Sequence, residues 1–324
     1  MTTATAHAEF VAQRRAYLGG TDIGALIGVS PWASPLSVYL DKVAPEQAEE
    51  KDSLPMRRGL VLERFIADEF MRETGLVCWH PAPIVRTDWG FPAGASIDYL
   101  VAYPDHPRTP IGLMDAKTAM SFYGRRQWQA PDPNRGYEEG DLPDAYYTQL
   151  AWYLAVTELP RAWGVADTGD DSLIKVPVKP NAQVQAKLID AGLRFWTDHV
   201  LAGIPPEPTG TDSDHDALQR MWPETVPEPP VYIEDPVAEG ILSDYLAGKA
   251  REEEGRRIAE QAKQRLESIM GENERAVVGG WQLQWKPVTS NRIDSKRLKA
   301  ELPEVAAQFS KPSTSRRFDV KESS

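Results

Sequence analysis

The pattern of apolar and polar positions predicts a mixed α/β domain over residues 1–210. Residues 56–74 carry apolar side chains at helical spacing and stop at Gly75, a residue that ends helices well. Strand-like segments follow at 77–87, 94–101 and 111–118, and a further helix is predicted from about residue 144 to residue 156. Near the N-terminus, two shorter helices are predicted over residues 23–27 and from residue 34, with Thr21 and Asp22 as candidate caps of the first.

The composition changes after residue 204, where prolines become frequent. Eight of them fall between residues 205 and 236, a density typical of a linker or of an extended segment. Residues 237–270 then read as one long polar helix, and the sequence around Gly279-Gly280 predicts a hairpin. We therefore expect three regions, which are a core over 1–210, a proline-rich linker over 211–236 and a C-terminal extension over 237–324.

Composition and charge exclude some classes of protein. No apolar run approaches the about 20 residues that cross a bilayer, and the N-terminal segment has no apolar signal region. We therefore expect a cytoplasmic protein without a membrane partner. The formal net charge of -12 argues against broad nonspecific binding to nucleic acid, but an enzyme needs only a local basic channel.

The residue types that could bind a metal ion favour oxygen atoms as its ligands. Cys78 is the only cysteine, which excludes an internal disulfide and a four-cysteine metal site within the chain. The five histidines are scattered without ligand spacing. A metal bound here should therefore be magnesium, manganese or calcium.

The segment "GLMDAKT" at 112–118 holds the most informative pair of charges. Side chains alternate along a strand, so Asp115 and Lys117 should face the same side, at the end of an apolar run. The acid-x-lysine pattern also occurs at Glu49/Lys51, Asp294/Lys296 and Asp319/Lys321, in polar surroundings. A structural ion pair is the competing interpretation, and a metal or phosphate site is the functional one.

A second acid is expected beside this pair. Asp98 lies in "GASIDYLV", and a hairpin turning between residues 104 and 110 would bring it near Asp115. Two carboxylates and the Ala116 carbonyl suit a hard divalent cation, and Glu63 on the preceding helix is a candidate further ligand. Lys117 would then stabilise, or help to deprotonate, a water molecule that attacks a phosphodiester.

Five segments together resemble a known family. These are "GGTDIGALIGVSPWASPLSVYLDK", "RRGLVLERFIADEFMRETG", "GASIDYLV", "GLMDAKT" and "YYTQLAWYLAVT". In that order they resemble the motifs of the YqaJ-type viral recombinase nucleases, relatives of the phage lambda exonuclease within the PD-(D/E)xK nucleases. The resemblance implies a restriction-endonuclease-like core, with a mixed central sheet flanked by helices, and a C-terminal helical arm with a small hairpin.

The resemblance also implies roles for single residues. Asp98 and Asp115 match the metal-binding acids, Lys117 matches the catalytic lysine, and Glu63 matches a helix glutamate near the metal. The acid before the lysine is an aspartate here, where close relatives more often have glutamate.

Other matching residues lie outside the acid-x-lysine strand. Gln149, with Tyr153, matches a helix glutamine that would orient Lys117 or the phosphate. Thr21 and Arg14 match residues that hold the 5′-phosphate of the cut strand, and the neighbouring Arg15 is the alternative to Arg14.

The implied activity is magnesium-dependent 5′-to-3′ digestion of linear double-stranded DNA, with manganese as a substitute metal. It would leave 3′ single strands for phage-type recombination in a bacterial cell, with a single-strand annealing protein as partner and a ring-shaped homo-oligomer as the working form. Two alternatives stay open, namely an endonuclease or junction-cutting enzyme of the same chemistry, and a non-catalytic DNA-binding scaffold that assembles through the helix at 237–270.

Overall fold

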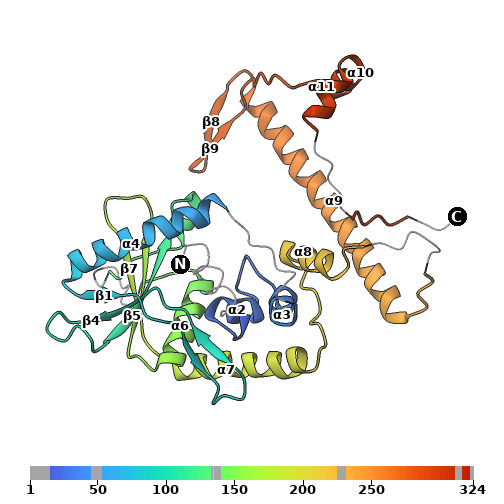
Figure 1. The fold of residues 1–324 in the computed structure, drawn as a ribbon. Helices are drawn as coiled ribbons and strands as arrows, with labels where there is room; N and C mark the ends of the chain where they lie inside the picture. The colour runs from blue at the N-terminus through green and yellow to red at the C-terminus, as the bar shows by residue number, and fades with distance from the viewer. Residues whose placement is uncertain are drawn as a thin grey trace. The chain divides into compact units, whose positions relative to one another are not determined.

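The chain divides into two compact units. In the computed structural model these are Met1–Glu224 and Thr225–Ser324 (Figure 1). The structure describes residues 15–44, 53–132, 134, 140–224, 231–310 and 316–321. Arg14, one of the two residues expected to hold a 5′-phosphate, lies outside these ranges.

A five-stranded sheet forms the centre of the first unit. Its strands lie in the order β1 (Val77–Trp79), β4 (Tyr99–Ala102), β5 (Gly112–Thr118), β6 (Ala162–Asp167) and β7 (Ile174–Val178). Neighbouring strands are antiparallel except for β5 and β6, which are parallel. A parallel pair needs a long crossover, and this one contains α5 (Phe122–Arg126) and α6 (Asp144–Thr157). The predicted mixed central sheet with flanking helices is confirmed.

Helices cover both faces of this sheet. α4 (Leu54–Thr74) buries Ile66 and Phe70 against Met114 of β5, whereas the adjacent residue Leu113 packs into the cluster that contains α6. Since neighbouring strand residues point to opposite faces, α4 and α6 lie on opposite sides of β5. α4 begins at the Ser53 cap and ends at Gly75, whose φ of 71° suits glycine, so the helix predicted over 56–74 is confirmed.

The strands expected over 77–87 and 94–101 are each split. The first gives β1 and β2 (Ile84–Arg86), with Pro81 and Pro83 between them. The second gives β3 (Ala93–Ala95), which pairs with β2, and β4, which pairs with β1 and β5. Asp98 was expected within a strand and instead lies in the bend before β4, because the chain changes sheets there.

The remaining helices of the first unit pack around this frame. They are α2 (Gly20–Leu26), α3 (Pro35–Val43), α7 (Ala182–Phe195), the π-helix η3 (Trp196–Leu201) and α8 (Asp212–Met221). The short helices expected near the N-terminus correspond to α2 and α3. α8 lies within the segment expected to be a linker; its Ala217 is buried in the main core and its Arg220 pairs with Asp41 of α3.

The second unit consists of a long helix and small elements. α9 (Pro236–Met270) is followed by β8 (Arg275–Val278), β9 (Trp281–Gln284), α10 (Ser295–Glu301) and α11 (Pro303–Gln308). Gly279 and Gly280 adopt positive φ angles of 54° and 83° in the β8–β9 turn. The predicted long helix and hairpin are confirmed. Among the described residues, no helix is long and apolar enough to cross a membrane.

Candidate active site

Asp115 and Lys117 form an ion pair on one face of β5. They lie two residues apart on a regular strand, so both point to the side of the sheet that α6 covers. Asp115 is 1% exposed, whereas the Lys117 side chain is 18% exposed. The Lys117 ammonium also lies 5.2 Å from the centre of the Tyr146 ring of α6. Lys117 is thus fixed between a carboxylate and an aromatic face.

Asp98 reaches β5 from the bend before the neighbouring strand, β4. Its Oδ2 accepts a hydrogen bond of 2.9 Å from the backbone N–H of Ala116, the residue between Asp115 and Lys117. The carbonyl oxygen of Asp98 is in turn 2.6 Å from His80 Nδ1. The β4–β5 hairpin therefore brings Asp98 beside the acid-x-lysine segment, as its spacing in the sequence predicts.

The charges of the site strongly influence one another. Burial raises the pKa of Asp98 to about 8, and the nearby negative charge of Asp115 adds to this effect. Burial alone would lower the pKa of Lys117, but the charges of Asp115 and Asp98 outweigh it, so the pKa of Lys117 lies above its ordinary value. The metal-free site therefore holds a charged lysine and favours a proton on Asp98.

Glu63 belongs to the same electrostatic cluster from α4. Burial raises its pKa, the charge of His80 opposes this, and Asp115 and Lys117 act on it with opposite signs. Within the described residues, no three His, Cys, Asp or Glu side chains lie close enough together to hold a metal ion. Asp98, Asp115 and Glu63 therefore do not form a preassembled metal site of three carboxylates.

The donors nevertheless suit a hard divalent cation. Oδ1 of Asp115 is buried and has no hydrogen-bond partner among the described residues. A buried carboxylate oxygen without a partner costs free energy, which a bound cation would offset. The other expected donors, a carboxylate of Asp98 and the carbonyl of Ala116, are also oxygens, the ligand type that magnesium prefers.

Gln149 lies on α6, at its contact with α2. It is 7% exposed, and its Nε2 donates a hydrogen bond of 2.8 Å to the Tyr153 hydroxyl one turn later. Tyr153 lies near enough to Lys117 to contribute, as the smallest of several causes, to its raised pKa. Gln149 was expected to orient Lys117 or the phosphate; the structure shows it holding Tyr153, which lies near Lys117.

Thr21 lies in the first turn of α2 and is exposed. The sequence suggested Thr21 or Asp22 as the cap, but the N-cap is Gly19, whose N–H donates to Asp22 Oδ2 at 2.9 Å. α2 begins earlier than expected because Asp22 reaches back three residues and also pairs with Lys42 of α3 at 2.8 Å.

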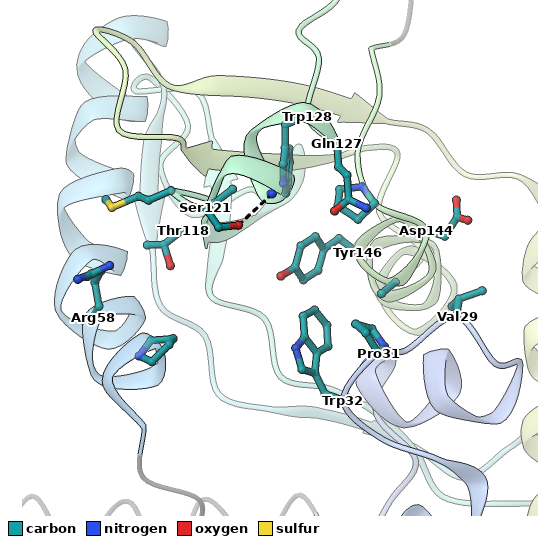
Figure 2. A pocket seen from close by; sticks show the side chains of 16 residues that line it. Val29, Pro31, Trp32, Arg58, Thr118, Ser121, Gln127, Trp128, Asp144 and Tyr146 are labelled. Carbon is teal, nitrogen blue, oxygen red and sulfur yellow. Dashed lines mark hydrogen bonds between the residues drawn. The ribbon is translucent and has the colours of Figure 1, made fainter. Parts of the chain in front are cut away.

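A cleft of about 630 Å³ borders this site and was not anticipated from the sequence (Figure 2). Thr118, which directly follows Lys117, contributes to its lining, as do Arg58 of α4 and Tyr146 of α6. Trp32, in the loop between α2 and α3, stands beside Tyr146. The signal in the sequence was the "SPW" segment at residues 30–32, but nothing local connects it with residue 146.

Comparison with known proteins agrees with the sequence motifs. Residues 9–160 match the YqaJ-like viral recombinase domain. The chain is also similar to the YqaJ protein of Bacillus subtilis strain 168, with 27% identity over 319 residues that cover 97% of this chain and 94% of that one.

Solved structures with partial similarity include exonucleases. The alkaline exonuclease LHK-Exo from Laribacter hongkongensis is 19% identical over 61% of this chain and 94% of its own, with a TM-score of 0.47. LHK-Exo in complex with dAMP gives 18% identity over 66% and 97%, with a TM-score of 0.48. A phage-related exonuclease from Haemophilus somnus 129PT is 9% identical over 60% and 99%, with a TM-score of 0.40.

Proposed function

We propose that this chain is a magnesium-dependent nuclease that digests linear double-stranded DNA from its 5′ ends. The match of residues 9–160 to the YqaJ-like viral recombinase domain supports the proposal. The observation that carries the proposal is the hydrogen bond from Ala116 to Asp98, which joins both acids and Lys117 into one cluster. The buried Asp115 Oδ1, which has no hydrogen-bond partner among the described residues, also supports the proposal, because it could bind the metal ion of a metal-dependent nuclease.

Asp98, Asp115 and the carbonyl of Ala116 would hold the metal, with Glu63 assisting from α4. A bound Mg²⁺ or Mn²⁺ makes water more acidic and stabilises negative charge on phosphate oxygens. Lys117 is charged and is held by Asp115 and Tyr146, so it would position the attacking water or stabilise the charge that develops on the phosphate. Tyr153, held by Gln149, supports that position.

Binding of the 5′-phosphate of the cut strand would determine the direction of digestion. The proposal assigns this contact to Thr21, which is exposed in the first turn of α2, and to Arg14, with Arg15 as the alternative. The product would be a 3′ single strand, the substrate of a single-strand annealing protein in phage-type recombination.

Assembly is a separate part of the proposal. We infer that the chain forms a ring-shaped homo-oligomer around DNA and that residues 237–324 contribute to assembly or to docking of the annealing protein. α9 exposes several large apolar side chains, which supports an interaction role; these include Ile241, Leu242 and Leu246. Chains with and without residues 237–324 should differ in the number of subunits per particle in solution, or in their binding of the annealing protein.

The decisive experiment offers the protein linear duplex DNA in the presence of Mg²⁺. Substrates with a 5′-phosphate and with a 5′-hydroxyl are compared with a closed circle, and Lys117→Ala is compared with Lys175→Ala, a strand lysine of another ion pair. We expect shortening of the phosphorylated linear DNA from its 5′ ends, an intact circle and loss of activity in Lys117→Ala alone. Cutting of the circle would favour the endonuclease alternative, and no cleavage by the wild-type chain would favour the scaffold.

A further inference from the structure

A basic segment, defined as residues 275–299, begins with the hairpin that follows α9. It contains six Lys or Arg residues and one acid, so its net charge is +5 in a chain whose net charge is -12. All six cations are exposed; they are Arg275, Lys286, Arg292, Lys296, Arg297 and Lys299. The basic segment belongs to the second unit, whereas the candidate active site belongs to the first. Its charge therefore needs an explanation of its own.

Most of these cations have no carboxylate partner. Among the described residues, Arg297 is the only cation of the basic segment that forms an ion pair, which it does with Glu301. The single acid, Asp294, accepts a hydrogen bond of 2.9 Å from the backbone N–H of Arg297 and caps α10. Several cations of α9 instead pair with glutamates three residues away, as in Lys249–Glu252, Arg257–Glu254 and Lys263–Glu260. The basic segment therefore presents positive charge that the described residues do not neutralise.

The β8–β9 hairpin has two different faces (Figure 1). Val278 pairs with Trp281 across the hairpin, and Arg275 pairs with Gln284. Because side chains alternate along each strand, one face is apolar and consists of Ala276, Val278, Trp281 and Leu283. The other face, the donor face, consists of Arg275, Val277, Gln282 and Gln284. Three of its four side chains donate hydrogen bonds, and all three line a depression of about 360 Å³.

A two-stranded ribbon with donors on one face fits double-stranded DNA. The major groove admits such a ribbon, and Arg and Gln side chains bind both phosphate oxygens and base edges. Gly279 and Gly280 form the turn, so no side chain widens the tip of the ribbon. Phosphates repeat along both DNA strands, so one duplex can neutralise several cations, and the release of counterions favours this binding.

We propose that the basic segment is a second DNA-binding site, which binds the phosphate backbone of double-stranded DNA with the donor face of the hairpin directed into a groove. The inference rests on the proposed function in that double-stranded DNA is the substrate, and it adds a contact that needs neither a DNA end nor a metal ion. Contacts to phosphates carry no sequence information, which suits digestion of any sequence. The second unit would remain bound to the duplex while the first unit cuts, so more nucleotides are removed per encounter.

Binding to a closed circular duplex tests this site, because a circle offers no end to the nuclease site. Filter binding is measured in EDTA, which prevents cleavage, at several NaCl concentrations. The test variant combines three exposed cations without ion pairs, Arg275→Gln, Lys286→Gln and Arg292→Gln. It should bind the circle at least about 10-fold more weakly at low salt than wild type does. The slope of log affinity against log salt should become shallower by about 3, because each phosphate contact contributes about 1.

A control variant removes the same amount of charge from α9. It combines Lys249→Gln, Arg257→Gln and Lys263→Gln, whose cations already have carboxylate partners, and it should keep the wild-type salt slope. Circular dichroism and the number of subunits per particle verify that both variants keep their fold and assembly. Failure of the wild-type chain to bind the circle would overturn the second site, as would equal losses in the two variants. A loss confined to single-stranded DNA would also overturn it.

An acidic protein is the rival ligand of the basic segment. If the test variant binds the circle as tightly as wild type, with the same salt slope, the DNA site is overturned and an acidic protein surface becomes the ligand to seek. A charge-conserving variant, Arg275→Lys with Arg292→Lys, should retain most of the affinity for the circle, because phosphate contacts depend mainly on charge.

Digestion of linear duplex by the same wild-type sample distinguishes the two proposals. Digestion in Mg²⁺, without binding of the circle that depends on the basic segment, retains the nuclease and overturns the second site. Binding of the circle that depends on the basic segment, without digestion, retains the second site and overturns the nuclease. With both results positive, an excess of unlabelled duplex added during digestion should shorten the digested tracts more for the test variant than for wild type.

Discussion

The backbone of Gly20 packs so closely on Gln149 that a Cβ atom at residue 20 would lie 2.9 Å from Gln149 Cγ. This contact joins the first turn of α2, which carries Thr21, to the helix that holds Tyr153 near Lys117. The close approach between α2 and α6 therefore helps to position both Thr21, which is proposed to bind the phosphate, and the proposed catalytic lysine, Lys117.

Gly20→Ala should destabilise the first unit. The added methyl group meets both the side chain and the backbone of Gln149, and overpacking of this kind costs about 1–3 kcal/mol. Gly59→Ala on α4 is the matched control, because its added methyl group would have no atom within 4 Å and alanine favours helices by up to about 1 kcal/mol. Urea unfolding of both variants gives the comparison. Equal stabilities would contradict the close packing.

Lys117→Ala should reduce cleavage by at least about 100-fold while the protein still binds DNA, because the lysine contributes charge stabilisation rather than most of the affinity. It should also destabilise the metal-free protein, since it leaves the buried carboxylate of Asp115 without its cation; such losses reach about 3–5 kcal/mol. Lys175→Ala breaks the more exposed pair with Glu73 and should cost about 1 kcal/mol or less. Denaturant unfolding in EDTA, beside single-turnover cleavage, measures both effects.

Metal binding should release protons at neutral pH. Asp98 has a pKa raised to about 8 in the metal-free chain, so it holds a proton at pH 7 that a metal ligand must lose. Metal affinity should therefore rise with pH until about 8. Calorimetric titration of Mg²⁺ or Mn²⁺ in two buffers of different ionisation enthalpy measures the proton count, and Asp98→Asn should abolish the release. Identical heats in both buffers would contradict the prediction.

The same pKa sets how the metal-free protein responds to pH. An unfolded aspartate ionises near 3.8, whereas folded Asp98 ionises near 8, so this group favours the folded state below the lower value. Its contribution to the free energy of unfolding should fall as the pH rises from 4 to 8 in EDTA. Asp98→Asn should flatten this part of the curve, and addition of a divalent metal should restore stability at the alkaline end.

Asp214 should show the opposite dependence. Burial favours its neutral form, but hydrogen bonds from Ser34, Thr211 and Thr209 outweigh this and lower its pKa to about 2. The stability it contributes is present above pH 4 and is lost as the pH falls toward 2. Asp214→Ala should destabilise the first unit by about 1–3 kcal/mol, because four donors of Thr209 and Thr211 lose their acceptor. An unchanged unfolding midpoint would show that α8 is not integral to that unit.

The sequence by itself determined the elements whose signals are local. Apolar spacing and a terminal glycine predicted α4, and strand alternation placed Asp115 and Lys117 on the same side of β5. The hairpin at Gly279-Gly280 followed from the same kind of information. These features depend on residues within a few positions of one another, where backbone geometry relates sequence spacing directly to direction in space.

Only the tertiary structure decided which distant segments meet. Asp98 lies outside the strand predicted for it because β3 and β4 belong to different sheets. The strands with which β3 and β4 pair determine this, and the local sequence pattern does not. Trp32 and Tyr146 are stacked although a long stretch of chain separates them. The inclusion of α8 in the first unit likewise depends on contacts with α3. Periodicity describes one segment at a time, whereas strand pairing and side-chain packing depend on free energies shared between segments, so the final geometry of the site emerges only when the chain has folded.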